Sequence, residues 1–300
     1  MPLMRAVRLH PPGGLDGLVQ EQVEIPRPAT GEALVRVHAA AITRDELDWP
    51  VDRLPAIPSY ELSGVVEAVA PGADGVAAGE AVYALTPFDR DGAAAEYAVV
   101  PAALLAPKPP TLGHVESAAI PLAGLSAWQG LFTHGRLAQG ERVLVHGAAG
   151  GVGGFAVQLA RWRGAQVIGT ASTGNLDTAR RLGADQVVDH TTTRFEDAVG
   201  QVDLVFDTTG GERLERSPAV LRPGGRLVSV ATEPPAPPGI DAVYFVVEPD
   251  RAQLVQLARL ADGGDLRPTI DQVFPLADAH QAFARSLGGH PGGKIVLRVI

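Results

Sequence analysis

Short runs of alternating hydrophobic and polar residues mark the first hundred residues of the chain. Runs such as RAVRLH at 5–10, EALVRVHAAAI at 32–42 and AAEYAVVP at 94–101 have the two-residue period of β-strands. Glycine and proline separate the runs, as in APGADGVAAGE at 70–80, which is typical of a turn between two strands. This part of the sequence therefore predicts a β-rich, barrel-like domain.

The pattern changes at about residue 115. Residues 115–135 have helical apolar spacing with a break at Pro121, and strands then alternate with helices. The predicted strands are RVLVHG, QVIGT, QVVDH, DLVFDTTG, GRLVSVA and AVYFVVE. Such alternation indicates a parallel sheet wrapped by helices. We expect the final strand, GGKIVLRVI, to return to the first domain, which gives an α/β protein with domains at 1–117 plus 250–300 and at 118–249.

Composition and charge narrow the possible partners. The formal net charge is −9 and no block of basic residues occurs, which argues against nucleic acid or an anionic membrane as partner. No apolar stretch approaches the roughly 20 residues that span a bilayer, and no signal-peptide pattern begins the chain, so we expect a cytoplasmic protein. The absence of cysteine excludes disulfides, thiolate catalysis and cysteine-ligated zinc.

A glycine cluster lies between one predicted strand and the helix that follows it. Val143–Val145 form the strand, and Phe155–Arg161 belong to the helix. The loop between them contains Ala149, Gly150, Gly151, Val152 and Gly153. Bare glycines let phosphate oxygens approach the backbone N–H groups at a helix N-terminus. A purely structural turn is the alternative, but the strand–helix units that follow favour a dinucleotide-binding site with a pyrophosphate on this loop.

The second strand of this domain indicates which dinucleotide binds. An NAD site would place a carboxylate there for the ribose 2′-hydroxyl. The sequence instead has Thr170, Ser172, Thr173 and Asn175, with Arg180 shortly after. Hydroxyl, amide and guanidinium groups can donate hydrogen bonds to a 2′-phosphate, which favours NADPH. The alternative is that these residues only cap the next helix, and the carboxylate of Asp177 is unfavourable for a phosphate.

Several motifs together resemble one family. HGAAGGVGGFAVQLAR, GTAS, RLGADQVVDH and VFDTTGG are similar to the zinc-free branch of the medium-chain dehydrogenase/reductase superfamily, which includes quinone oxidoreductases, zeta-crystallin and polyketide enoyl reductases. IPSYELSGVVEAVAPGADGVAAGEAVYAL and GGKIVLRV extend the resemblance over nearly the whole chain. It implies a GroES-like β-rich catalytic domain, a Rossmann cofactor domain and an active site in the cleft between them.

The resemblance also identifies the positions of missing metal ligands. Thr43 stands where zinc-dependent members of the superfamily have a cysteine, and Tyr60, before Glu61, stands where they have a histidine. The other histidines are scattered singly, so we expect no metal. Ser59 also departs from the family, which usually has glycine there, and Glu80–Ala81 replaces an acidic–basic pair.

Without a metal, the remaining chemistry is hydride transfer to an activated alkene or a quinone. The developing enolate needs only hydrogen-bond donors, which Thr43 and Tyr60 could supply, and Tyr60 could also be the proton source. The alternative for both residues is ordinary pocket lining. Trp49, Phe88 and Tyr244 are candidates for an apolar substrate pocket, whereas the helical spacing around Trp128 predicts a core position.

Further cofactor contacts follow from the resemblance, position by position. His190 falls where related proteins stack a ring on the adenine, and the others end strands at the carboxyl edge of the sheet. These others are Asp207, Thr208, Thr209, Val230, Ala231, Phe245, Val246 and Val247.

We therefore predict an NADPH-dependent, zinc-independent oxidoreductase that reduces a small-molecule quinone or α,β-unsaturated carbonyl compound. One alternative is an enoyl reductase for a biosynthetic intermediate, either free or bound to a carrier. Another is a non-catalytic NADPH-binding protein. The resemblance also implies a homodimer, formed through the AVYFVVE strand.

Overall fold

The structure is a computed structural model that describes residues 2–50, 52–289 and 292–300. Its chain divides into two compact units. Unit 1 comprises Met1–Leu122, Pro249–Gly264 and Pro268–Ile300, and unit 2 comprises Ala123–Glu248 and Asp265–Arg267. The first boundary falls inside helix α2, Pro121–Trp128, which begins at the predicted break.

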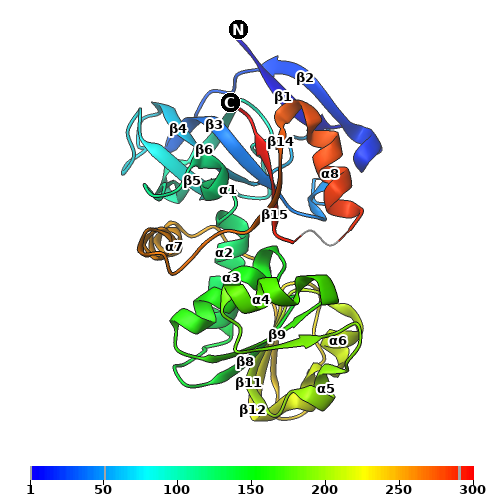
Figure 1. The fold of residues 1–300 in the computed structure, drawn as a ribbon. Coiled ribbons are helices and arrows are strands. Elements are labelled where there is room, and N and C mark those ends of the chain that lie inside the picture. The colour runs from blue at the N-terminus through cyan, green and yellow to red at the C-terminus, as the bar shows by residue number, and fades with distance from the viewer. Residues whose placement is uncertain (1, 51, 290–291) are drawn as a thin grey trace. The chain divides into compact units, whose positions relative to one another are not determined.

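Unit 2 is built on a six-stranded, wholly parallel sheet with the strand order β10-β9-β8-β11-β12-β13. Figure 1 labels β8, β9, β11 and β12 of this sheet. The strands are β8 (Arg142–His146), β9 (Gln166–Ala171), β10 (Gln186–Asp189), β11 (Val202–Asp207), β12 (Leu221–Ser229) and β13 (Asp241–Tyr244). The helices are α3 (Gly151–Trp162), α4 (Leu176–Leu182), α5 (Phe195–Ala198) and α6 (Gly211–Arg216). The central strand β11 is buried along its whole length, as expected for a parallel strand covered on both faces. This order confirms the predicted doubly wound sheet.

The last strand of this sheet is shorter than the predicted AVYFVVE strand. β13 ends at Tyr244, and residues 245–250 continue without regular structure. The side-chain amide of Gln129 forms two hydrogen bonds with the backbone of Glu248. Its Nε2 donates to the Glu248 carbonyl at 2.8 Å, and its Oε1 accepts from the Glu248 N–H at 3.0 Å. A side chain therefore satisfies backbone groups that a longer strand would have paired in a sheet.

Unit 1 contains a seven-stranded sheet and a separate two-stranded ribbon, β1-β2. The sheet runs β14-β15-β3-β4-β5-β7, and β6 also pairs with β3. The strands are β1 (Leu3–Leu9), β2 (Leu18–Glu24), β3 (Glu32–Ile42), β4 (Glu61–Val69), β5 (Ala81–Leu85), β6 (Tyr97–Pro101), β7 (Ala106–Pro107), β14 (Ile270–Pro275) and β15 (Lys294–Arg298). The helices are α1 (His114–Ala118), α7 (Arg251–Gly263) and α8 (Ala279–Leu287).

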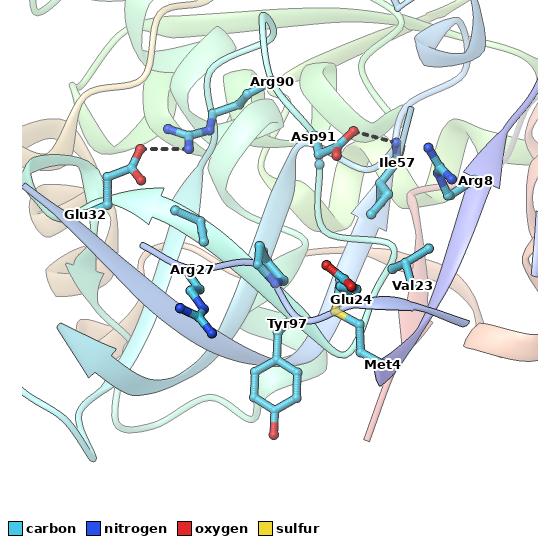
Figure 2. Close-up of a pocket in the computed structure, with 14 residues that line it drawn as sticks. Met4, Arg8, Val23, Glu24, Arg27, Glu32, Ile57, Arg90, Asp91 and Tyr97 are labelled. Carbon is cyan, nitrogen blue, oxygen red and sulfur yellow. Dashed lines mark hydrogen bonds and ion pairs between the residues drawn. The ribbon is translucent and has the colours of Figure 1, made fainter. Parts of the chain in front are cut away.

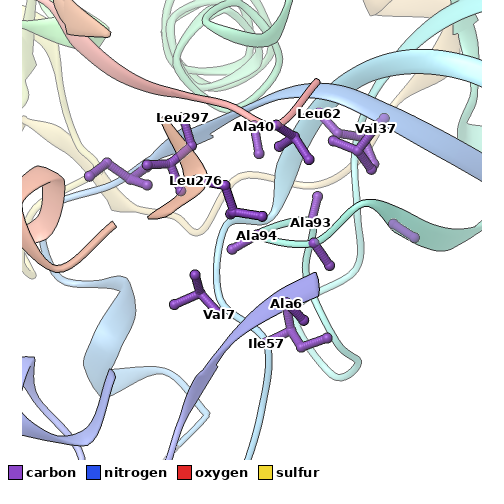
Figure 3. Packing of buried hydrophobic residues seen from close by; sticks show 14 of the residues in the cluster. Ala6, Val7, Val37, Ala40, Ile57, Leu62, Ala93, Ala94, Leu276 and Leu297 are labelled. Atoms are coloured by element: carbon purple, nitrogen blue, oxygen red, sulfur yellow. The ribbon is translucent and has the colours of Figure 1, made fainter. Parts of the chain in front are cut away.

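Distant parts of the chain meet in this sheet. β15 pairs antiparallel with β3 and parallel with β14. The core beneath contains many alanines, such as Ala40, Ala93 and Ala94, packed with Leu62 and Leu297 (Figure 3). Small side chains allow strands from both ends of the chain to approach closely, and burying the larger aliphatic ones contributes about 1.5–3 kcal/mol each.

Short helical turns complete both units. The 3₁₀ turns cover Leu15–Gly17, Glu46–Asp48, Ala102–Leu104, Thr173–Asn175, Ser217–Val220 and Leu276–Asp278, and a π-helical segment covers Gln129–His134. Among the described residues, no helix combines the length and apolar character that crossing a membrane requires.

Candidate functional site

The glycine loop connects β8 to α3, and its glycines leave the backbone bare at Gly147, Gly150, Gly151 and Gly153. Gly147 has a φ of 75°, and its carbonyl accepts from the Gly150 N–H at 2.8 Å. A Cβ at Gly153 would lie 2.1 Å from the Gly147 carbonyl oxygen, so only glycine fits there. The first N–H groups of an α-helix have no partner within the helix. Residues Ala149–Gly153 therefore fit a pyrophosphate.

Strand register brings the other predicted cofactor residues to the same edge of the sheet. His146 pairs with Thr170 on one side and with Asp207 on the other, and Asp207 pairs in turn with Ser229. All these residues stand at the carboxyl ends of parallel strands, where such folds bind ligands. Thr208 and Thr209 follow Asp207, and Val230 and Ala231 follow Ser229.

A buried hydrogen-bond network lies directly beneath the loop. His146 Nδ1 is 3.1 Å from Thr170 Oγ1, and its Nε2 is 3.0 Å from Ser217 Oγ. Burial lowers the pKa of His146 to about 4, so the ring is neutral at pH 7. Thr170 is fully buried, which places its hydroxyl beneath the loop rather than at the surface. His146 was not predicted, because a single histidine in a strand gives no signal of its partners.

Asp207 organises the turn after β11. Its carboxylate accepts from the backbone N–H of Gly210 at 2.9 Å and from Ser229 Oγ at 2.9 Å. The other oxygen accepts from Thr209 Oγ1 at 3.0 Å. The Thr208 hydroxyl donates to the His146 carbonyl at 2.8 Å. These bonds link the ends of β8, β11 and β12 into one rigid edge.

The polar residues after β9 lie close together but already have partners. Thr173 Oγ1 donates to Asp189 Oδ2 at 2.6 Å, and this bond and those from Thr191 hold the pKa of Asp189 below its usual range. Arg180 pairs with Asp177 at 2.7 Å on the helix surface. Asn175 donates to Ser172 Oγ at 3.2 Å. The His190 N–H donates to the Ala171 carbonyl at 3.1 Å, which brings His190 to the end of β9.

Residues 245–247 follow β13 and are held by their neighbours. The Phe245 N–H donates to the Ser229 carbonyl at 3.2 Å, and the Phe245 ring lies 4.4 Å from the His134 ring. Gln129 fixes the backbone of the following Glu248. Val246, in contrast, is 60% exposed. The predicted nicotinamide segment thus has a fixed backbone and one outward side chain.

In unit 1, Tyr60 packs in an aromatic cluster. Its ring centroid lies 5.6 Å from that of Trp49 and 5.4 Å from that of Phe88, and the latter two lie 5.1 Å apart. Two of the three predicted pocket residues therefore surround Tyr60. Tyr244, the third, belongs to unit 2 at the end of β13, where it is 40% exposed.

Each candidate hydroxyl receives a hydrogen bond from a cation that the sequence did not point to. The Arg53 guanidinium donates to Tyr60 Oη at 2.8 Å. The Lys294 Nζ donates to Thr43 Oγ1 at 3.3 Å and forms an ion pair with the buried Glu61. Burial raises the pKa of Tyr60 to about 12 although Arg53 opposes this, so Tyr60 keeps its proton at pH 7.

Glu46 is a buried carboxyl group next to Thr43. It is 0% exposed, and its Oε2 accepts from the Thr43 N–H at 3.1 Å. Its Oε1 has no hydrogen-bond partner among residues 2–50, 52–289 and 292–300. Burial raises the pKa of Glu46 to about 8, with Glu61 adding to the rise and Lys294 opposing it. At neutral pH this side chain therefore carries a proton.

The raised pKa of Glu46 predicts falling stability above pH 6.5. Folded Glu46 keeps its proton up to about pH 8, whereas the unfolded chain loses it near its ordinary pKa of 4.5, so stability decreases with rising pH by up to about 1.4 kcal/mol per unit. The buried His146 and the half-buried His114, whose pKa values fall to about 4, have the opposite effect on stability between pH 4 and 6.5. We expect maximal stability near pH 6.5, measured by urea unfolding across pH.

The variant Glu46→Gln should flatten the decline in stability between pH 6.5 and 8. The control Glu80→Gln, which changes an exposed carboxylate, should not. An unchanged decline in Glu46→Gln would contradict the assignment of this decline to Glu46.

Ser59 occupies a backbone conformation that suits glycine. Its φ is 68°, it is fully buried, and its Oγ has no hydrogen-bond partner within the described part of the chain. This conformation explains why glycine is usual at this position in the family that the sequence resembles.

We expect Ser59→Gly to stabilise the protein by about 1 kcal/mol. Relief of a left-handed non-glycine residue contributes about 1–2 kcal/mol, and the greater freedom of glycine in the unfolded chain offsets part of this gain. Ser59→Ala keeps the strained backbone conformation but removes the unpaired hydroxyl, so its stability should lie between that of the parent protein and that of Ser59→Gly. Urea unfolding midpoints measure the order, and a less stable Ser59→Gly would refute it.

A cavity of about 390 Å³ opens in unit 1 near the ends of the β1-β2 ribbon (Figure 2). Figure 2 shows two interactions in its lining: Arg90 pairs with Glu32 at 2.8 Å, and Asp91 accepts from the Ile57 N–H at 2.9 Å. None of the sequence-predicted site residues lines it. Among the described residues, no group of three or more histidine, aspartate or glutamate side chains is placed to hold a metal ion.

Comparison with family models finds two matches in this chain. Residues 29–110 match the model described as an alcohol dehydrogenase GroES-like domain, and residues 182–297 match a zinc-binding dehydrogenase. The first match confirms the GroES-like character predicted for the β-rich part.

Individual relatives cover most of the chain. It is 33% identical to a 2-methylene-furan-3-one reductase of Solanum lycopersicum, over 96% of this chain and 77% of the relative. It is 32% identical to an NADPH-dependent alkenal/one oxidoreductase of Arabidopsis thaliana, over 95% and 77%. It is also 34% identical to the spectinabilin polyketide synthase system protein NorB of Streptomyces orinoci, over 97% of this chain but 14% of that protein. Among solved structures, a quinone oxidoreductase from Coxiella burnetii is similar, with a TM-score of 0.92, 28% identity and coverage of 100% of both chains.

Proposed function

Because this chain belongs to the zinc-free branch of the medium-chain dehydrogenase/reductase superfamily, we propose that it reduces a quinone or an α,β-unsaturated carbonyl compound with NADPH. The observation that carries the proposal is the pair of hydroxyls, Thr43 and Tyr60, at the positions of the missing metal ligands, each backed by a cation. The names of the relatives, which include a quinone oxidoreductase and an alkenal/one oxidoreductase, support the substrate class.

In this proposal, unit 2 holds the dinucleotide. The backbone of Ala149–Gly153 binds the pyrophosphate, Thr208 and Thr209 lie beside the nicotinamide-side ribose, and residues 245–247 meet the nicotinamide end. The bare glycine loop, the rigid Asp207 turn and the clamped Glu248 backbone support these roles. His190 follows β10 at the same edge of the sheet, which supports a place beside the adenine.

The phosphate on the adenosine ribose is the finer part of the proposal. No carboxylate follows β9 within Ala171–Asn175, and Ser172, Thr173 and Asn175 all carry donors. Arg180 would supply a positive charge after leaving Asp177, an exposed partner that costs little to exchange. The carboxylate of Asp189, which accepts a hydrogen bond from Thr173, would repel a phosphate at this position. Selectivity for NADPH over NADH should therefore be moderate.

The bound cofactor supplies a hydride. When the β-carbon of an enone accepts it, the electron pair of the C=C bond moves toward the carbonyl, and the oxygen gains the charge of an enolate. Thr43 and Tyr60 donate hydrogen bonds to that oxygen and stabilise the charge. A proton then completes the α-carbon. Tyr60, which carries its proton at neutral pH, is the proton source in this proposal, and solvent restores that proton.

The test is the oxidation of NADPH by purified protein with a panel of enones and quinones, followed at the nicotinamide absorbance against a control without acceptor. We expect turnover with at least one enone and a higher kcat/KM with NADPH than with NADH. Equal values would overturn the assignment of NADPH, and binding of NADPH without turnover of any acceptor would favour a non-catalytic cofactor-binding protein.

An enoyl reductase for a carrier-bound intermediate is the second candidate. The match to a relative named as a polyketide synthase system protein, of which this chain covers 14%, favours it. Comparing an enoyl thioester with the free enone separates the two: a large preference for the thioester indicates the biosynthetic role.

Assembly and location belong to the same proposal. β13 is an edge strand and is followed by the exposed Val246, which supports a homodimer formed along this edge. Measuring the mass in solution tests it. The cytoplasm remains our predicted location.

A further inference from the structure

Arg53 constrains what the hydroxyl of Tyr60 can do. Its Nη2 donates to Tyr60 Oη at 2.8 Å, to the Phe88 carbonyl at 2.9 Å and to the Arg90 carbonyl at 2.6 Å. A guanidinium has donors only, so the Tyr60 oxygen must accept in this bond. The hydroxyl proton of Tyr60 is therefore left for a different acceptor.

Lys294 constrains Thr43 in the same way. It is 6% exposed, and its Nζ donates to the Ile42 carbonyl at 3.1 Å and to Thr43 Oγ1 at 3.3 Å while forming an ion pair with Glu61. An ammonium group also has donors only. The Thr43 oxygen accepts from it, and the single hydroxyl proton is free to donate elsewhere. Thr43 itself is half-buried, whereas Lys294 and Glu61 are buried.

We propose that Arg53 and Lys294 are positioning residues that fix Tyr60 and Thr43 as hydrogen-bond donors toward the substrate oxygen. This inference rests on the proposed function. Neither cation can accept the hydroxyl proton, and among the described residues neither hydroxyl donates to a protein acceptor. Their charge also strengthens each hydroxyl as a donor, because a bond from a cation polarises the O–H group that receives it.

A purely structural role makes different predictions. Arg53 also ties down the chain near Phe88 and Arg90 through two carbonyls, so its loss could act by loosening that segment. In that case the loss of Arg53 would lower activity whether or not the Tyr60 hydroxyl is present. If Arg53 acts through the hydroxyl, its loss matters only when the hydroxyl is there.

The first experiment is a double-mutant cycle on enone reduction at saturating NADPH. We expect Arg53→Met and Tyr60→Phe each to lower kcat by about 100-fold with little change in KM, at the lower end of the range found for a lost oxyanion donor. The double variant should be no slower than Tyr60→Phe, and Arg53→Lys should recover part of the rate. Arg5→Met, which removes an exposed arginine paired with Glu96, is the matched control and should leave kcat unchanged. Multiplied losses in the double variant overturn the inference.

A second measurement needs no turnover. The infrared C–O stretching band of isotopically labelled tyrosine reports whether a tyrosine hydroxyl accepts or donates, and Tyr60→Phe identifies the Tyr60 band among the four tyrosines. Arg53→Met should shift this band, and Arg5→Met should not. An unmoved band refutes the inference even if the protein reduces enones. If the parent protein reduces no acceptor but the band shifts, the proposed function fails while the assignment of the hydroxyl stands.

The Lys294 arm uses a background without an unpaired buried charge. Lys294→Met combined with Glu61→Gln removes the cation and its carboxylate partner together. The Leu122 N–H donates to Glu61 at 2.9 Å, and glutamine retains an oxygen that can accept this hydrogen bond. Thr43→Val should lower kcat in the parent protein and have a markedly smaller effect in this background. An equal loss in both proteins would contradict the role of Lys294.

Discussion

Gly153→Ala is expected to weaken NADPH binding by at least about 100-fold, a loss of about 2.7 kcal/mol. The added Cβ would lie 2.1 Å from the Gly147 carbonyl oxygen and 2.7 Å from its carbonyl carbon. Both are backbone atoms, so the loop must move to accommodate the methyl group. Because the loop presents its N–H groups as one set, a displacement that relieves the clash also removes several of them from the pyrophosphate.

The next residue supplies a matched control. A Cβ at Gly154 would meet only the end of the Leu182 side chain, at 3.2 Å, which can rotate away. Gly154→Ala should therefore bind NADPH nearly as tightly as the parent protein. Titration calorimetry measures both affinities, and circular dichroism shows that the sheet and helices are retained. Unimpaired binding in a folded Gly153→Ala protein would show that the pyrophosphate lies elsewhere.

Lys294→Met should destabilise unit 1 by about 3–5 kcal/mol, because it leaves the fully buried Glu61 carboxylate without its cation. This is a large share of the 5–15 kcal/mol that separates most folded domains from their unfolded states. The loss also deprives the Ile42 carbonyl of a donor at 3.1 Å. Adding Glu61→Gln should bring stability back to within about 2 kcal/mol of the parent, since no charge then remains in the interior.

Fluorescence can follow this unit separately. Trp49 is in unit 1, and the other two tryptophans, Trp128 and Trp162, are in unit 2. In a Trp128→Phe/Trp162→Phe background, Trp49 alone reports the unfolding of unit 1 in urea. If Lys294→Met unfolds at the same urea concentration as its parent, the ion pair contributes no stability. If Lys294→Met with Glu61→Gln is less stable than Lys294→Met alone, the packing lost in the double variant outweighs the cost of the unpaired charge.

Local patterns accounted for the parts of the fold that depend on neighbours in sequence. The strand, glycine loop and helix of residues 142–162 could be predicted because the loop conformation requires glycine and the flanking apolar periods differ. The predicted strand AVYFVVE was too long, because its apolar residues are typical of a strand along its whole length. The Gln129 side chain that hydrogen-bonds to the Glu248 backbone lies 119 positions away in the sequence. No window of sequence contains both partners.

The same limit applies to the candidate site. Thr43 and Tyr60 could be selected through a family resemblance, but Arg53 stands in a loop among other charges, and Lys294 is 251 positions from Thr43. Their importance arises from the bonds that the fold creates. Ser59 is the intermediate case: the sequence showed an unusual residue, and the φ of 68° supplies the physical reason.

The pairing of β15 with β3 determines when the sheet of unit 1 can be completed during synthesis on the ribosome. The edge of β3 at Ala39–Ile42 receives its partner only when residues 295–298 emerge, after the whole of unit 2 has been synthesised. At about 5–20 residues per second, the 252 positions between Ile42 and Lys294 take roughly ten seconds to a minute to translate. Throughout that interval the nascent chain exposes an unpaired apolar strand edge. The speed at which unit 2 is translated therefore determines how long unit 1 needs protection from aggregation.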